Sequence, residues 1–279
     1  MTINALNKSL AITSSSDGIL YSKYPNGNAI GVDPWYWEGL ETSLNGLSTI
    51  TSHGTVAWDA GGFARITYSA QGQTAIQWAI PAGNTAIVVE YEVRKNTGAN
   101  SSKMLKIPAR GAYVSPYSKY SNVTAFGGGY TSNTVRITGY SDHSNGGDTA
   151  LSIRTTGTNT GTYTRATPTF ATVTGVEATY DTTGTVWHKM KLWAKMNSDN
   201  TADGEFAVWK DDVLILHMTG VYNCATTTGD GTNAGVSAAD LSLYQDRDKV
   251  SIGDYANAGG FYEDYKNLKI GFTRPSSLP

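Results

Sequence analysis

The chain has 279 residues, a net charge of -2 and 39% hydrophobic residues. This balance excludes a disordered chain, and it excludes a nucleic-acid-binding protein held by a broad positive field. A chain of this length can bury a sizeable core without stabilising cross-links, and the single Cys224 rules out an intrachain disulfide. No apolar run approaches the roughly 18 residues of a membrane span, and residues 1–18 lack the pattern of a Sec-type signal peptide. We therefore expect a protein made and kept in the cytosol, or assembled there before release by lysis.

The composition favours strands joined by turns. The chain contains 31 glycines, 17 tyrosines and 7 tryptophans, together with abundant Thr, Ser and Asn. Residues 1–30 are polar and contain the turn-forming sequence YPNGN, so we expect them to form an N-terminal arm or extension. Residues 31–279 are expected to form a single β domain.

Short alternating or apolar runs recur from residue 55 onward, between clusters of turn-forming residues. The glycines at 127–129 lack a following Lys-Ser/Thr, so we interpret them as a flexible loop and not as a phosphate-binding loop. Only residues 237–244 have a short helical pattern. About a dozen strands without alternating helices predict an all-β jelly-roll sandwich with very little helix. The predicted strands are residues 55–60, 62–70, 74–80, 85–95, 103–109, 133–140, 149–156, 186–196, 204–210, 212–220, 249–256 and 265–273.

The longest informative strand, residues 186–196, alternates between two kinds of side chain. We predict that its apolar face lies in the core, and that the other face is exposed or lines a groove. The apolar face carries Val186, His188, Met190, Leu192, Ala194 and Met196, and the opposite face carries Trp187, Lys189, Lys191, Trp193 and Lys195.

The stretch NSDNTADGEF, residues 197–206, begins like a calcium-binding loop. The twelfth position of that pattern is Lys210, where a bidentate Glu is needed, and strand rather than helix follows. We therefore predict a hairpin loop in which Asn and Asp side chains bond the turn. Asp199 and Asp203 remain only weak candidates for a surface cation site.

A second hairpin is predicted to turn at Asp211 and Asp212. A two-residue turn there pairs Trp209 with Leu214, and Phe206 with His217. The Asp-Asp pair is poorer than Asp-Gly at this position, because both residues must adopt a positive φ.

Three stretches resemble a known family: VWHKMKLWAKMNSDNTADGEFAVWKDDVLIL, TAIVVEYEVRKNTGANSSKMLKIPARG and FYEDYKNLKIGF. They look like concanavalin A-like jelly rolls, and most like the branch that contains heparin-, alginate- and glucuronan-type polysaccharide lyases. The resemblance covers roughly residues 85–273. It implies two curved antiparallel sheets, with ligands bound on the concave face.

Lyase activity of that family would imply a Tyr or His base, a cation that neutralises the uronate, and a nearby Gln or Asn. None of the four histidines has a Gln two residues before it, and Tyr265 and Lys266 are adjacent, so they point to opposite faces of a strand. Glu90 and Glu92 share a strand face, but Arg94 interrupts the pattern of a retaining glycosidase. We therefore assign no catalytic residue and expect no cofactor.

The histidines on strands are better explained as structural residues. His188 lies on the apolar face of its predicted strand, and His217 lies among Leu214, Leu216 and Met218. We expect both histidines to be buried.

Cations and tryptophans on the predicted strands are the candidate binding residues for a glycan or a protein partner. Aromatic-plus-cation surfaces suit acidic glycans and protein interfaces about equally well. The candidates are Lys103, Lys106, Arg110, Trp187, Lys189, Lys191, Trp193 and Lys195.

Three functions remain open from the sequence. Composition and the absence of catalytic motifs favour a structural virion protein of a tailed phage, a capsid decoration or tail-associated protein, assembled in the host cytoplasm. Such a protein would form a homo-oligomer, contact other virion proteins, offer a surface for a glycan, and bind neither nucleic acid nor membrane. The alternatives are a polysaccharide lyase and a non-catalytic carbohydrate-binding module. The assignment to a phage particle is an analogy based on fold and composition.

Overall fold

The computed structural model describes residues 35–96, 102–108, 110, 123–129, 132–140, 150–154, 169–173, 186–221, 227, 237–239, 241–256 and 258–279. The predicted arm over residues 1–30 lies outside these ranges, and the division at residue 30 stays a prediction. No helix in the described ranges is long and apolar enough to cross a membrane.

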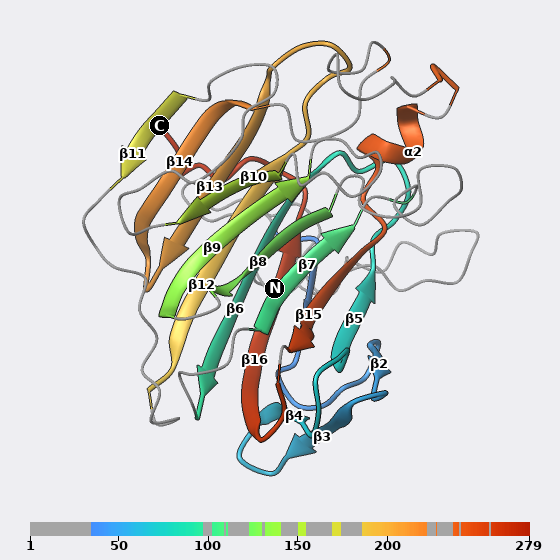
Figure 1. Cartoon of the computed structure of the whole chain (residues 1–279), viewed down its shortest axis with the longest axis vertical. Coiled ribbons are helices and arrows are strands. Elements are labelled where there is room, and N and C mark those ends of the chain that lie inside the picture. The colour runs from blue at the N-terminus through green and yellow to red at the C-terminus, as the bar shows by residue number, and fades with distance from the viewer. Residues whose placement is uncertain are drawn as a thin grey trace, which may run out of the picture.

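Two antiparallel sheets stack face to face to form the molecule (Figure 1). The nine-stranded sheet runs in the order β11 (Thr169–Val173), β14 (Val213–Val221), β13 (Gly204–Lys210), β12 (His188–Lys195), β6 (Ala86–Lys95), β16 (Phe261–Gly271), β4 (Phe63–Tyr68) and β3 (Gly54–Asp59), with β1 (Trp37–Gly39) also paired to β16. The seven-stranded sheet runs β10 (Ala150–Arg154), β9 (Ser132–Tyr140), β8 (Val123–Gly129), β7 (Ser102–Pro108), β15 (Lys249–Ala256), β5 (Ala75–Ala79) and β2 (Ser48–Ile50). A short helix, α2 (Leu241–Gln245), precedes β15.

The predicted all-β jelly-roll sandwich is confirmed, and each predicted strand overlaps an observed one. Four further strands, β1, β2, β8 and β11, did not stand out in the sequence. The interpretation of residues 127–129 as a loop was wrong, because these glycines end β8 and pair with β9. Ladder hydrogen bonds need no side chain, so a glycine-rich strand can form wherever its neighbour supplies the partner groups.

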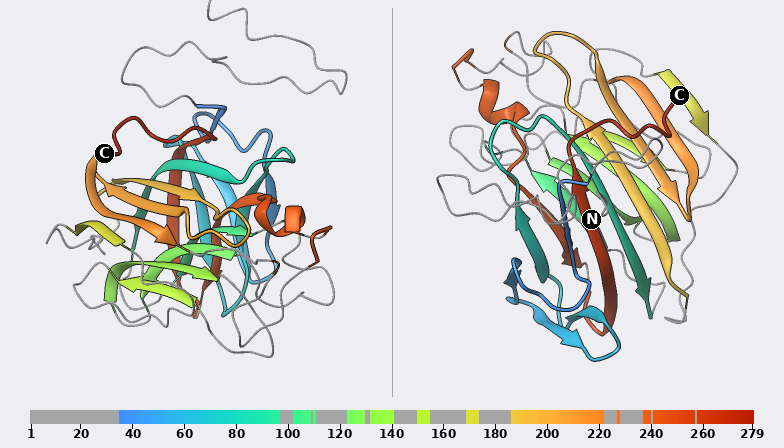
Figure 2. Two further views of the ribbon diagram at one scale, coloured as in Figure 1. Left: turned by 90° about the horizontal axis from the view of Figure 1, so that it is seen from above. Right: turned by 180° about the vertical axis from the view of Figure 1, so that it is seen from behind.

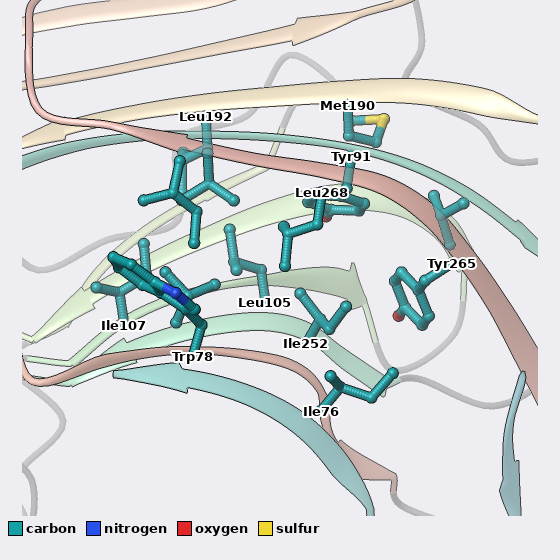
Figure 3. Close-up of a cluster of buried hydrophobic side chains, with 14 of the residues drawn as sticks. Ile76, Trp78, Tyr91, Leu105, Ile107, Met190, Leu192, Ile252, Tyr265 and Leu268 are labelled. Carbon is teal, nitrogen blue, oxygen red and sulfur yellow. The ribbon is translucent and has the colours of Figure 1, made fainter. Parts of the chain in front are cut away.

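The core lies between the sheets, and strands such as β6, β12 and β15 contribute alternate residues to it (Figure 3). Met190, Leu192 and Tyr91 of the nine-stranded sheet face Leu105 and Ile252 of the seven-stranded sheet. The predicted division of residues 186–196 is therefore confirmed for its central part, where Met190, Leu192, Ala194 and Met196 are all buried in this core.

A polar cluster lies within the core near the start of β16. Glu263 of β16 lies directly opposite Lys95 of β6 in the strand register, and both residues are buried. The hydroxyl groups of Tyr68 and Tyr265 donate to Glu263 Oε2 at 3.2 and 2.7 Å. Desolvation, followed by the nearby Glu263 charge, raises the pKa of the Tyr265 hydroxyl well above its usual value. These hydroxyl groups help to satisfy a carboxyl group that burial would otherwise penalise.

The predicted two-residue turn between β13 and β14 is confirmed. Asp211 and Asp212 have φ values of 50° and 66°, which is the conformation of a type I′ hairpin turn. Asp211 also accepts hydrogen bonds from the backbone N–H of Lys189, at 2.9 Å, and the ring of His188, at 2.8 Å. The turn therefore ties β12 to the hairpin that follows it.

The register of this hairpin is correct at the turn and wrong beyond it. Trp209 pairs with Leu214 as predicted, but an irregularity between Val208 and Trp209 shifts the pairs of residues 205–208 by one residue. Phe206 consequently pairs with Met218 rather than with His217. A β-bulge of this kind inserts one residue on one strand and leaves little trace in the alternation of the sequence.

The two turn residues should respond oppositely to glycine. Asp212→Gly should raise the free energy of unfolding by no more than about 0.5 kcal/mol, because glycine adopts a positive φ without steric cost but the exposed ion pair between Asp212 and Lys189 Nζ, at 2.5 Å, is lost. Asp211→Gly should lower it by about 1 kcal/mol, because the two hydrogen bonds of the Asp211 carboxylate are lost. Urea unfolding followed by circular dichroism measures both changes, and equal effects of the two substitutions would contradict this account.

Candidate functional site

The outward side of the nine-stranded sheet carries rows of alternating charge, and we call it the charged face. In one row Glu90 of β6 lies between Lys191 of β12 and Lys269 of β16. In the next row Glu92 lies between Lys189 and Lys266. Cross-strand neighbours of opposite charge stabilise such a sheet, so the arrangement is a consequence of register.

Ion pairs within the charged face neutralise most of its cations. Lys266 Nζ lies 3.2 Å from Glu92 Oε2, and Lys269 Nζ lies 3.7 Å from Glu90 Oε1. The ammonium group of Lys191 lies 4.8 Å from the centre of the Trp209 ring. Desolvation raises the pKa of Glu90, although Lys269, Lys189 and Lys191 oppose this shift. The face therefore offers mixed charge rather than a positive field.

An arginine–aromatic cluster occupies one end of the charged face; it comprises Arg65, Arg94, Phe63, Trp187 and Tyr262 around Asp264. The fully buried Asp264 carboxylate accepts from Arg65 Nε at 2.7 Å and from Arg94 Nε at 2.9 Å. Arg65 lies over the Tyr262 ring at 3.9 Å, and Arg94 lies over the Trp187 ring at 4.6 Å. The buried carboxylate thus holds two partly exposed arginines against aromatic rings.

The other end of the charged face is covered by the closing segment, residues 273–279. Leu278 is buried among Val88, Trp193, Ala207 and Trp209, which together we call the apolar patch. Figure 2 shows the segment crossing the outer side of the nine-stranded sheet toward β13 and β14. The prediction that the Trp and Lys face is exposed or lines a groove is therefore wrong at Trp193, which is only 2% exposed beneath this cover.

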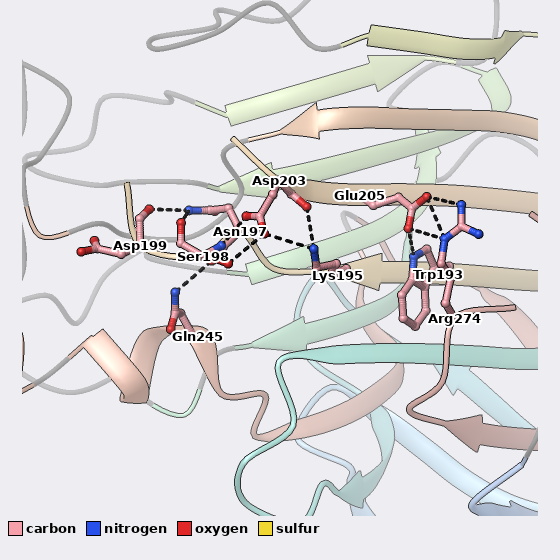
Figure 4. Close-up of polar contacts among 9 residues, drawn as sticks. All are labelled: Trp193, Lys195, Asn197, Ser198, Asp199, Asp203, Glu205, Gln245 and Arg274. Carbon is pink, nitrogen blue, oxygen red and sulfur yellow. Dashed lines mark hydrogen bonds and ion pairs between the residues drawn. The ribbon is translucent and has the colours of Figure 1, made fainter. Parts of the chain in front are cut away.

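Glu205 is the polar centre beside the apolar patch (Figure 4). Its carboxylate accepts from Arg274 at 2.8 and 3.0 Å, from Trp193 Nε1 at 2.7 Å and from His217 Nε2 at 2.7 Å. Burial alone would raise the pKa of Glu205, but the hydrogen bonds from Arg274, His217 and Trp193 lower it to about 2. Glu205 is therefore ionised, and the ring nitrogen of His217 must be the donor.

The hairpin loop at residues 197–203 uses its carboxylates to hold itself together (Figure 4). Asp203 accepts from the Ser198 hydroxyl at 2.8 Å and from Lys195 Nζ at 3.2 Å. Asp199 accepts from the backbone N–H and the hydroxyl of Thr227, both at 2.7 Å. Across the described ranges, no group of three or more His, Cys, Asp or Glu is placed to hold a metal ion. The two weak cation candidates thus act here as hydrogen-bond acceptors.

The structure separates the candidate binding residues into two sets. Trp187, Lys189, Lys191, Trp193 and Lys195 lie on the outward side of the nine-stranded sheet, whereas Lys103 and Lys106 lie on β7 of the seven-stranded sheet. Leu105 and Ile107 are buried in the core, so Lys106 faces away from it, on the opposite side of the sandwich. The side chain of Lys103 lies outside the described part. One positive face made of both sets is therefore not formed.

Arg110 is held at the end of the sandwich, beyond β7. It donates from Nε to Asp246 at 2.8 Å and from NH1 to Asp248 at 3.3 Å. Its NH2 group donates to the carbonyl of Ile80 at 3.0 Å. These bonds connect the end of β7 to the segments that flank β5 and β15. Arg110 therefore has a structural role.

The two strand histidines are each tied to a carboxylate. His188 is only partly buried and bonds Asp211 of the turn, so full burial was a wrong expectation. His217 is buried as expected and bonds Glu205, and within the described part of the chain its Nδ1 atom has no partner.

Sequence reasoning missed Asp264, Glu205 and Arg274 as organising residues. For the first, the sequence of β16 offers only Tyr262, two residues before Asp264 on the same strand face, beside which a buried Asp would need a cationic partner. The pairing of Glu205 with Arg274, 69 positions along the chain, depends on tertiary structure alone.

Comparisons with known proteins show a shared fold. No family model and no curated protein matches the chain. Among solved structures, an endo-β-1,4-glucuronan lyase from the fungus Trichoderma reesei is 16% identical with a TM-score of 0.54, over 86% of this chain and 96% of that one. A PL-14 alginate lyase from Aplysia kurodai is 13% identical with a TM-score of 0.43, over 86% of this chain and 91% of that one. The first likeness shows that the chain has the β-sandwich fold of a polysaccharide lyase.

The ionised Glu205 should make the free energy of unfolding depend on pH. Its pKa is about 2 in the folded chain, against an ordinary value of 4.5, so the unfolded chain binds more protons between these values. The stabilisation is therefore complete above about pH 5 and is lost as the pH falls toward 2, with a total of about 3 kcal/mol. Urea unfolding at a series of pH values measures this loss.

Glu205→Gln is the matched control for that titration. It keeps the size of the side chain and removes the titrating group, so the slope of stability against pH between 5 and 2 should decrease. An unchanged slope in this variant would assign the acid sensitivity to other carboxyl groups.

Proposed function

We propose that the protein is a non-catalytic structural component of a tailed phage particle, a capsid decoration or tail-associated protein. In this proposal it forms a homo-oligomer and uses the charged face to contact a surface glycan or another virion protein. The observation that carries the proposal is the arginine–aromatic cluster. Trp, Tyr and Arg are the residues most enriched at the energetic centres of protein interfaces, and aromatic rings also stack on sugars.

The buried Asp264 supports a recognition role for this cluster. It holds the guanidinium groups of Arg65 and Arg94 in place before any ligand arrives, and an already ordered side chain loses less entropy on binding. Trp187 is placed by Arg94 on its ring at 4.6 Å, by Lys266 at 4.3 Å and by Phe63 at 5.8 Å. The cluster is therefore a rigid surface that remains partly exposed.

The ion pairs of the charged face support a role that does not require catalysis. Elimination from a uronate needs a cation that neutralises the substrate carboxylate, so that the neighbouring proton becomes removable. Asp264 bonds both Arg65 and Arg94 and offsets one of their two positive charges, Lys266 pairs with Glu92, and Lys269 pairs with Glu90. A uronate on this face would have to compete with these carboxylates.

A polysaccharide lyase is the second candidate, and the fold shared with the glucuronan lyase favours it. A direct assay separates the two. The protein is incubated with glucuronan, alginate and heparin, and the ultraviolet absorbance of the double bond that β-elimination forms in the product is followed. Our proposal predicts no increase, whereas turnover that a substituted Lys or Tyr abolishes would establish the lyase.

Trp187→Ala tests the binding surface. We expect a loss of at least about tenfold in affinity for a glycan found on an array, or for the virion protein recovered with this chain from purified particles, because truncating an aromatic anchor costs more than 1.4 kcal/mol. Leu243→Ala, at an exposed position of α2, is the control and should bind normally. Equal binding by Trp187→Ala and the unchanged protein would remove the arginine–aromatic cluster from the proposal, and absence of the chain from purified particles would remove the virion role.

A further inference from the structure

The strand β3 forms one edge of the nine-stranded sheet (Figure 1). It pairs with β4, and within the described ranges no other strand pairs with it. The carbonyl of His53, just before β3, accepts from the Ser69 N–H at 2.9 Å, so residue 53 directs its backbone groups toward β4. Backbone groups alternate in direction along an antiparallel strand. Val56 and Trp58, at odd-numbered spacings from His53, therefore direct their N–H and C=O groups away from the sheet.

This edge lacks the devices that usually keep an edge strand from pairing with another chain. Such devices are Pro or Lys residues, β-bulges, a very short strand or a covering segment. The six residues of β3, GTVAWD, include neither Pro nor Lys, and the register with β4 has no irregularity. Apart from the ladder with β4, no backbone bond to residues 54–58 is present in the described part of the chain. Thr55 and Ala57 are exposed, so a partner strand can reach the edge.

The strands at the other sheet edges are shorter than β3. The strand β2 has three residues, and β10 and β11 have five each. The pairing of β11 with β14 is also interrupted between Phe170 and Thr172. Among these sheet edges, β3 is therefore the longest, and its pairing is regular.

The sequence of β3 is complementary to itself in an antiparallel arrangement. With a two-fold axis through Val56, each Val56 exchanges both backbone bonds with Val56 of the other copy, and Gly54 lies opposite Trp58. The Trp58 ring then covers a strand position that has no side chain. The fold itself requires glycine there, because a Cβ at position 54 would collide with the Thr67 carbonyl oxygen.

The same arrangement brings no like charges together on the outward side of the sheet. Thr55 of one copy lies opposite Ala57 of the other, and both residues are small and uncharged. Behind them, the register with β4 places Thr67 opposite Thr55 and Arg65 opposite Ala57. The charged faces of the two copies therefore continue into one surface, with an arginine–aromatic cluster on each side of the axis.

We propose that β3 is the surface through which two copies of this chain join, by antiparallel pairing of β3 with β3 about Val56. The two nine-stranded sheets then form one continuous sheet. The proposal deepens the proposed function, and it rests on the homo-oligomer named there. It also gives the oligomer a consequence for binding, because two clusters on one surface can engage a repeating ligand together, which raises the effective concentration of the second contact.

Sedimentation velocity of the full chain at increasing concentration tests the edge. Val56→Pro removes the N–H that points away from β4 and leaves the bonds to β4, since an edge strand tolerates proline where its N–H faces solvent. We expect the unsubstituted protein to dimerise, and Val56→Pro to raise the dissociation constant of the dimer at least about tenfold, because the two central bonds are lost. Val56→Thr keeps the N–H and the side-chain shape, so this matched control should dimerise normally.

Cysteine cross-linking tests the register and the identity of the partner. Thr55→Cys and Ala57→Cys are made as separate proteins, each with Cys224→Ser, so that the new thiol is the only one in the chain. The two are mixed with oxidised glutathione, which is reduced to two thiols as one disulfide forms between the copies. Directly opposite residues of an antiparallel pair meet disulfide geometry, whereas diagonal ones lie too far apart. The mixture should therefore cross-link at least about tenfold faster than either variant alone.

The outcomes separate this proposal from the rest of the proposed function. An oligomer that Val56→Pro leaves unchanged would overturn β3 as the joining surface and would leave the homo-oligomer standing. Equal cross-linking by the mixture and by the single variants would overturn the register. Circular dichroism verifies folding, and if Val56→Pro does not fold, the cross-linking decides alone, because its substitutions in β3 lie at exposed positions.

A chain that stays monomeric at every concentration and does not cross-link would remove the joining surface together with the oligomer. Binding of a glycan or a virion protein by the arginine–aromatic cluster is measured separately, with Trp187→Ala. Failure of that binding would alter neither sedimentation nor cross-linking, so the two failures are distinguishable.

Discussion

The alternation of side chains along β6 is the constraint on which the rest of the structure depends. Ile87, Val89, Tyr91 and Val93 lie in the core, so the intervening Val88, Glu90, Glu92 and Arg94 must lie on the outward side of the nine-stranded sheet. Because β12 and β16 pair with β6 on either side, they inherit the same division. Register therefore determines which charges meet, and it produces both the charged face and the apolar patch from one central strand.

Two buried carboxylates then connect this sheet to segments that alternation does not control. Asp264 draws Arg65 of β4 and Arg94 of β6 to one point, and Glu205 draws Arg274 from beyond the last strand. An ionised carboxylate removed from water is costly unless it is paired and hydrogen-bonded, so each one requires its arginines. At Glu205 the arginine comes from the closing segment, which therefore covers Trp193. At Asp264 both arginines come from strands of the sheet itself, so Trp187 remains partly exposed.

The fold was predictable from local patterns, whereas the site was not. The strand at residues 186–196 and the turn at Asp211 and Asp212 are determined by alternation and by turn geometry, and both were predicted correctly in their central parts. The bulge at Val208 and Trp209 changes register without changing composition, so the pairing beyond it was missed. The lysines of β7 and β12 look equivalent along the chain, and only the strand order shows that they belong to different sheets. The cover over Trp193 depends on residues 273–279, whose short polar sequence has no periodicity to interpret.

The pairing of charges within the face constrains which ligands it can favour. A ligand carboxylate would be repelled by the buried Asp264, which cannot leave, and so it would gain less from Arg65 and Arg94 than from two unpaired guanidinium groups, although the three groups keep a net charge of +1. Binding free energy on this face must therefore come mainly from contact with the rings of Trp187, Phe63 and Tyr262, and from hydrogen bonds to guanidinium N–H groups that Asp264 does not use. Hydroxyl-rich sugars and the polar backbone of a protein partner both present such acceptors beside apolar surface. The two ends of the face therefore differ. The Glu205 carboxylate binds an arginine from outside the sheet, whereas the Asp264 carboxylate orders two arginines of the sheet that stay partly exposed and can contact a partner.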